Sequence, residues 1–67
     1  MQEKIGVTAG HVWEYLYKHG SVSAIELKLE LGITNTLLYL ALGWLAREDK
    51  IELTELDHSF KISLKQQ

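Results

Sequence analysis

The chain contains no cysteine and no proline. Without cysteine it has neither disulfide bonds nor thiolate metal sites. The absence of proline removes the residue that most often interrupts a helix or a ladder of strand hydrogen bonds. Three histidines are present, but they are far apart and lack the spacing of metal ligands. We therefore expect no structural zinc and no cofactor.

Positive charge is also sparse. Seven Lys and Arg residues stand against nine Asp and Glu residues, which gives a formal net charge of -2. The cations are scattered singly, whereas a tight DNA-binding domain usually concentrates them to displace counterions from phosphates. The composition therefore predicts weak non-specific binding to DNA at most.

Long apolar runs and targeting signals are missing as well. The longest unbroken apolar run covers residues 37–42, which is far too short to cross a bilayer. The first ten residues lack the basic and apolar regions of a signal peptide. We expect a cytoplasmic protein with no membrane partner.

What the chain does have is apolar character: 46% of its 67 residues are hydrophobic. This length predicts a single domain over residues 1–67. A domain of this size buries only about 60% of the surface that its unfolded chain exposes. With no disulfide or metal to reinforce it, such a domain depends on packing and self-association.

A first helix is predicted to begin near Thr8, whose hydroxyl can cap free backbone N–H groups, after a polar lead-in over residues 1–6. Gly20 is placed to end this helix in a left-handed conformation. Five apolar residues recur at helical spacing and predict a buried face that includes both large aromatic rings. They are Ala9, Val12, Trp13, Leu16 and Tyr17.

The next segment is ambiguous between helix and strand. Apolar and charged residues alternate over residues 25–31, which is a strand pattern. However, Ser23 followed by Glu26 forms a capping box, the segment is rich in strong helix formers, and Gly32 stands where a helix commonly ends. We therefore predict a second helix that ends at Gly32.

A third helix is predicted from a cap at Thr34 to about Glu48. Two short segments with alternating apolar residues follow, at 51–55 and 60–64, and predict a β-hairpin. Ser21 and Val22 can add a short third strand. The predicted fold is α+β: a winged helix-turn-helix, with three helices followed by a two-stranded wing.

The chain resembles a family of short prokaryotic winged helix-turn-helix proteins whose function is not established. The resemblance is carried by residues 5–10, by Val12 and Trp13, by residues 23–32 and above all by the run over residues 41–51. It implies this fold, a stand-alone domain and no assigned catalysis. It transfers no functional residue to this chain.

The third helix carries apolar residues on nearly every side. On a helical wheel, one side holds the residues that a winged helix normally buries, which are Leu38, Ala41, Leu42 and Leu45. The opposite side forms an outward stripe of Leu37, Leu40, Gly43, Trp44 and Arg47.

Two interpretations of this stripe stay open. Trp44 alone can fold back beneath the wing or the first helix and belong to the core. However, one small core can hardly hide Leu37, Leu40 and Trp44 together, so we expect some of them to be exposed. Trp and Leu are anchor residues of protein interfaces, and Gly43 permits close approach of another backbone. The stripe therefore predicts a protein interface, most simply between two copies of the chain.

The alternative is a DNA-binding regulator. In such a protein the outward side of the third helix enters the major groove, where cationic and amide side chains read base edges. Here the stripe offers a single cation, at the end of the helix that usually contacts bases least. The possible nucleic-acid contacts are Lys28, Thr36, Tyr39, Arg47 and Lys61.

Catalysis finds no support in the sequence. Asp57, His58 and Ser59 are adjacent, but neighbouring residues of a turn rarely point at one another, and no pocket is predicted around them. Glu48 and Asp49 are more simply a helix end. The glycines are isolated and form no phosphate loop. We therefore predict no catalytic residue, no metal site and no small-molecule substrate.

Overall fold

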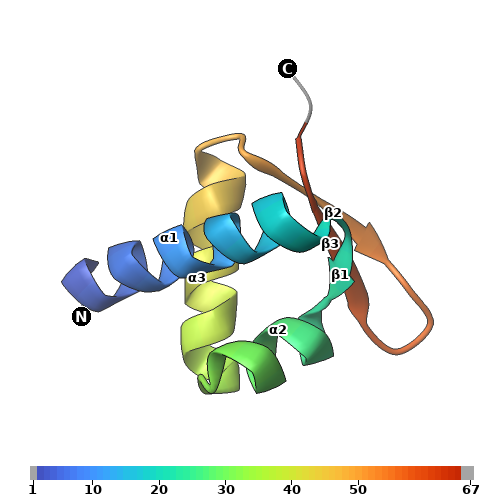
Figure 1. The fold of residues 1–67 in the computed structure, drawn as a ribbon, viewed down its shortest axis with the longest axis horizontal. Helices are drawn as coiled ribbons and strands as arrows, with labels where there is room; N and C mark the ends of the chain where they lie inside the picture. Colours follow the sequence, from blue (N-terminus) through green and yellow to red (C-terminus); the bar gives the residue numbers. More distant parts are fainter. Residues whose placement is uncertain (1, 66–67) are drawn as a thin grey trace.

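The computed structural model describes residues 2–65. Three helices surround one face of a small antiparallel sheet (Figure 1). The predicted fold is confirmed: α2 and α3 form the helix-turn-helix, and β2 and β3 form the wing. The elements are α1 (Gln2–His19), β1 (Val22–Ser23), α2 (Ala24–Leu31), α3 (Asn35–Arg47), β2 (Ile51–Glu55) and β3 (Phe60–Leu64).

Helix α1 begins earlier than predicted. It is already helical at Gln2, so the polar lead-in expected before Thr8 is wrong over the described residues, and Met1 lies outside them. Thr8 is buried within the helix rather than capping it. The physical reason is Ile5, which lies one turn before Ala9 and extends the same apolar face, so that packing favours a longer helix.

The predicted caps of α2 and α3 are present. The Ser23 hydroxyl accepts a hydrogen bond from the Glu26 N–H at 3.1 Å, and Thr34 caps α3 in the same way. Gly32 takes the left-handed conformation, with φ at 62°. The helical interpretation of residues 25–31 is confirmed. The reciprocal half of the capping box is not formed, because the Glu26 carboxylate instead accepts a hydrogen bond from Tyr15.

Helix α3 ends in a paired set of backbone hydrogen bonds. The Asp49 N–H donates to the Ala46 carbonyl and the Lys50 N–H donates to the Leu45 carbonyl, each at 3.0 Å. This is a Schellman motif, in which the chain turns through a left-handed residue. That residue is Asp49, with φ at 60°, a conformation that aspartate tolerates better than most residues.

The sheet has the strand order β1-β3-β2. Strands β2 and β3 pair along their whole length, from Phe60 opposite Glu55 to Leu64 opposite Ile51. The predicted third strand is confirmed one residue later than expected, where Val22 pairs with Ile62. Ile62 is fully buried.

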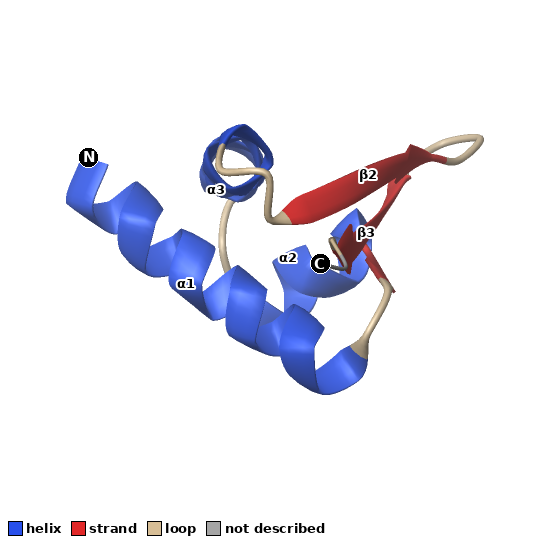
Figure 2. Ribbon diagram, turned by 90° about the horizontal axis from the view of Figure 1, so that it is seen from above, coloured by secondary structure: helices blue, strands red, loops and turns tan. Residues whose placement is uncertain are grey.

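The core lies where α1 crosses α3 and where both meet the sheet (Figure 2). The four α3 residues predicted to face inward are all buried. The largest side chains that are almost completely buried come from all three helices and from β3. They are Val12, Leu16, Leu27, Leu38 and Ile62.

Two aromatic residues of α1 lie outside this core, contrary to the prediction. Trp13 is 39% exposed and Tyr17 is 70% exposed. Their rings stack on each other, with centroids 5.3 Å apart. The narrower stripe of Ala9, Val12 and Leu16 already fills the contact with α3 and the sheet. The two rings project from an adjacent side of the helix and face solvent.

Within residues 2–65, no single helix is long and apolar enough to cross a membrane. Helices α2 and α3 meet the length and composition criteria only as a pair, and they are bent by 116° relative to each other.

Candidate functional site

The outward stripe of α3 is exposed in a single copy of the chain. We call its five predicted residues, Leu37, Leu40, Gly43, Trp44 and Arg47, the α3 face. Leu40 is 41% exposed and Trp44 is 45% exposed, whereas Leu37 is half-buried. The expectation that one core cannot cover all three large residues is confirmed.

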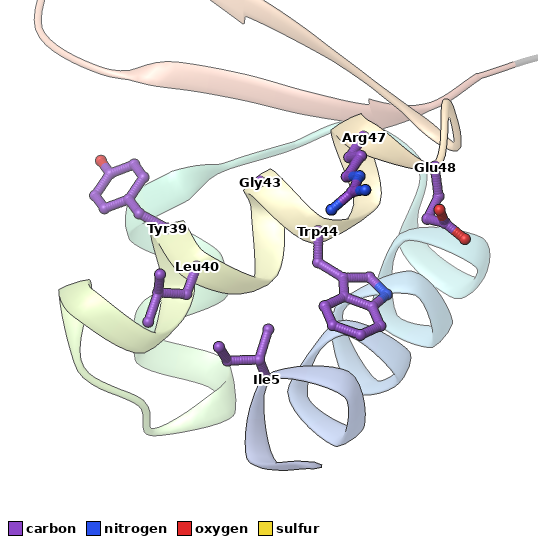
Figure 3. A pocket seen from close by; sticks show the side chains of 7 residues that line it. All are labelled: Ile5, Tyr39, Leu40, Gly43, Trp44, Arg47 and Glu48. Atoms are coloured by element: carbon purple, nitrogen blue, oxygen red, sulfur yellow. The ribbon is translucent and has the colours of Figure 1, made fainter. Parts of the chain in front are cut away.

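The α3 face borders an open hollow of about 460 Å³ (Figure 3). Ile5 reaches this hollow from the first turn of α1, and Figure 3 shows its side chain between those of Leu40 and Trp44. The opposite border is formed by Tyr39, whose ring packs edge-on against Phe60 of the wing at 6.4 Å. The lining residues are Ile5, Tyr39, Leu40, Gly43, Trp44, Arg47 and Glu48.

The hollow continues along α1. Trp44 also lines a second hollow of about 280 Å³, together with Gly6, Gly10 and Trp13. Trp13 in turn lines a third hollow with Tyr17. Lys50 borders both the second and the third hollow. Because neighbouring hollows share a tryptophan, they form one surface, which we call the α1–α3 trough.

The five candidate nucleic-acid contacts do not gather in one place. Lys28 is half-buried on α2, and Lys61 points away from the core on β3, beside Ser23 and Thr54. Thr36 and Arg47 are both exposed, but they lie at opposite ends of α3, about 16 Å apart along its axis. The cations among these residues therefore belong to three separate elements, α2, α3 and β3.

No arrangement for catalysis is found among residues 2–65. No group of three metal-ligating side chains is present there, and no buried side-chain nitrogen or oxygen lacks a hydrogen-bond partner. His58 takes part in none of the side-chain hydrogen bonds of this region. Asp57 and Ser59 flank it in a turn closed by the Leu56 N–H, which donates to the Ser59 carbonyl.

One polar contact joins α1 to α2. The Tyr15 hydroxyl donates to Glu26 Oε2 at 2.7 Å. This hydrogen bond, with partial desolvation of the phenol and the negative charge of Glu26, raises the pKa of Tyr15 from 10.0 to about 12. The phenol thus ionises later in the folded protein than in the unfolded chain. The contact stabilises the fold below pH 10 and loses its effect as the pH rises from 10 to 12.

We expect the variant Tyr15→Phe to remove a phase of tyrosine ionisation near pH 12. Ultraviolet absorbance titration of phenolate formation in the folded protein measures this directly. In parallel, the stability difference between the parent and Tyr15→Phe should shrink between pH 10 and pH 12. A phase near pH 12 that survives unchanged in the variant would refute the assignment.

Sequence reasoning missed the part of the surface that α1 contributes. The reason is that the helix was predicted to start near Thr8, which left Ile5 and Gly6 outside it. A signal was available, since Ile5, Ala9, Val12 and Leu16 follow one helical face.

Residues 1–64 match the sequence model of a family described as "Winged helix-turn-helix domain (DUF2582)". A relative from Methanocaldococcus jannaschii, described as an uncharacterized protein, is 43% identical over 68 residues, covering 97% of this chain and 96% of its own. A protein from Bacteroides thetaiotaomicron, solved by NMR in solution, has a similar structure with a TM-score of 0.82 and 30% sequence identity. That match covers 94% of this chain and 77% of the other. The chain therefore belongs to the DUF2582 family of winged helix-turn-helix domains.

Proposed function

We propose that this winged helix-turn-helix domain is a non-enzymatic interaction module that self-associates through the α3 face, most simply as a two-fold dimer in the cytoplasm. The observation that carries the proposal is the exposure of Leu40 and Trp44 on the helix that other winged helices present to DNA. If formation of the dimer controls a further process in the cell, the module has a regulatory role.

The composition of the α3 face supports a protein partner. Buried apolar surface contributes about 25 cal/mol per Å², and tryptophan is among the residues that most often dominate binding energy. Trp44 stands beside an open hollow, and Leu40 lies one helical turn away from it. Gly43, between them, would allow a partner backbone to approach closely.

The charge of the α3 face disfavours DNA as the main partner. Arg47 is its one cation, and Glu48 lines the same hollow. Phosphate recognition requires several cations that act together, because affinity comes largely from counterion release. A DNA-binding regulator built on the same fold is the alternative function, with Tyr39 and Arg47 as the exposed α3 residues that favour it.

The composition of the core supports a non-enzymatic role. Thr8 is the single polar residue buried in the described chain, so the core holds no titratable group whose pKa could be tuned for acid–base chemistry. We therefore propose no substrate and no cofactor.

Two substitutions test the proposal. We expect Leu40→Glu and Trp44→Ala each to weaken self-association at least tenfold, measured as dimer dissociation constants by sedimentation velocity. Leu29→Glu is the matched control, because Leu29 is 72% exposed on α2 and lies outside the α3 face. This control adds the same charge as Leu40→Glu. Equal dissociation constants for the parent, both variants and the control would refute the α3 face as the interface.

A further inference from the structure

Two helical glycines of the α1–α3 trough have no role in packing the single copy. Gly6 and Gly10 lie one turn apart within α1, and a Cβ added to either would have open space around it. Glycine destabilises a helix interior relative to alanine, so the fold alone gives no reason for it there. Both glycines line the same hollow as the exposed rings of Trp13 and Trp44.

We propose that a second copy of the chain occupies this part of the trough, with the two α1 helices antiparallel and closest at Gly10. The inference rests on the proposed self-association and places its two-fold axis. In this arrangement Gly10 meets Gly10 of the second copy, and Gly6 faces Glu14. Trp13 then lies over Val7 of the second copy, which is 60% exposed.

Charge complementarity favours this arrangement. The two ion pairs within residues 2–65 join Glu14 to Lys18 and Asp49 to Lys65, so Lys50 is unpaired in that part of the chain. Lys50 borders the hollow that contains Gly6. Because Gly6 faces Glu14 of the second copy, Lys50 approaches the carboxylate that already pairs with Lys18 within its own copy, and two-fold symmetry repeats this contact.

The same argument disfavours an axis at Gly43. An antiparallel crossing of two α3 helices there would set Arg47 against Tyr39 of the second copy, with no carboxylate at that position. The α1 crossing places an unpaired lysine beside a carboxylate, whereas the α3 crossing gives Arg47 no carboxylate partner. Trp44 lines both the hollow of the α3 face and the hollow of Gly6 and Gly10, so the α1 arrangement keeps the α3 face within the interface, beside the two-fold axis.

The length of α1 suits an interface of ordinary size. A stable dimer covers about 800 Å² on each partner, a patch about 28 Å on a side. This is roughly one sixth of the 4861 Å² accessible surface of one copy. Helix α1 has 18 residues and is therefore about 27 Å long.

Cysteine cross-linking locates the axis, and the chain has no native cysteine to interfere. A disulfide requires Cα atoms about 4.4–6.8 Å apart, which two equivalent residues reach only beside a two-fold axis. We expect Gly10→Cys, in a glutathione redox buffer, to form a covalent dimer at least tenfold more completely than Gly43→Cys. The variant Leu29→Cys, at an exposed position on α2, measures how much disulfide forms through random collisions between copies. Non-reducing electrophoresis provides the readout.

A charge exchange tests the contact across the interface. We expect Lys50→Glu and Glu14→Lys each to weaken self-association severalfold in sedimentation velocity, and the double variant to recover most of the parent affinity. A merely structural role for either residue would give additive losses instead. Gly10→Leu provides a second check: it should weaken association at least tenfold while the thermal unfolding temperature of the dilute protein does not fall, because a Cβ at this position has open space within one copy and leucine favours a helix more than glycine does.

The outcomes separate the two proposals. A dimeric parent in which Gly43→Cys cross-links more completely than Gly10→Cys would overturn the α1 arrangement and leave self-association standing. A double charge variant that self-associates more weakly than either single variant would also overturn the α1 arrangement. A parent that stays monomeric at high micromolar concentration would overturn both.

Discussion

Replacing Leu27 by alanine is expected to lower the free energy of unfolding by about 2–5 kcal/mol. Leu27 is completely buried, and α2 has only eight residues, of which Ala24 is the other buried one. The substitution removes apolar contacts and leaves a cavity where α2 meets the core. A domain of this length is typically stable by roughly 3–10 kcal/mol, so this one change removes a large share of the total.

Leu29→Ala is the matched control for this prediction. Leu29 belongs to the same helix, carries the same side chain and is 72% exposed, so its replacement is expected to change stability by less than about 0.5 kcal/mol. Both variants are compared with the parent by urea unfolding at one fixed protein concentration, because dimerisation adds to apparent stability. Similar losses in the two variants would show that α2 packs differently from the structure described.

The second prediction concerns the affinity of the domain for duplex DNA and the dependence of that affinity on salt concentration. A domain that neutralises six to ten phosphates loses about 10³–10⁵ in affinity between 50 and 200 mM salt. Here the candidate cations are Lys28, Arg47 and Lys61, on three separate elements. Phosphate contacts by these three cations would give a slope of about -2.7 and a loss of about 40-fold. We expect no saturable binding to mixed-sequence duplex below about 100 µM protein.

Fluorescence anisotropy of a labelled duplex measures this affinity, starting at the lowest salt concentration, where counterion release favours binding most. Tight binding with a steep salt slope would contradict the proposed function and support the DNA-binding alternative. In that case the cations would act together on one duplex, for example across a dimer.

The bounds of the helix-turn-helix and the wing could be predicted closely because single residues of known preference mark where each element begins and ends. Ser23, Thr34 and Gly32 act through their own hydroxyls or backbone freedom, and the structure shows each in the predicted role. The hairpin follows from strict alternation of apolar residues, and both strands have the predicted bounds. Such signals are local, so the sequence contains them completely.

The start of α1 and the surface around it depend on contacts between distant residues. Ile5 shares the helical face of Ala9 and Val12, but this periodicity alone does not show that α3 lies beside Ile5 and favours the longer helix. Trp13 and Tyr17 follow the spacing of a buried face, yet three smaller residues already fill the contact. The exposure of Leu40 and Trp44 could be predicted because a small core can enclose only a few large side chains. The residues that border Leu40 and Trp44 could not be predicted.

The mass of the parent protein in solution is the most direct test of the proposed self-association. Sedimentation equilibrium from about 1 µM to several hundred micromolar should show the weight-average mass rise from the monomer value of 7.7 kDa to twice that value, with reversible dissociation on dilution. A mass that remains at the monomer value over the whole range would contradict the account, because exposed Leu40 and Trp44 would then have no partner in a second copy of the chain.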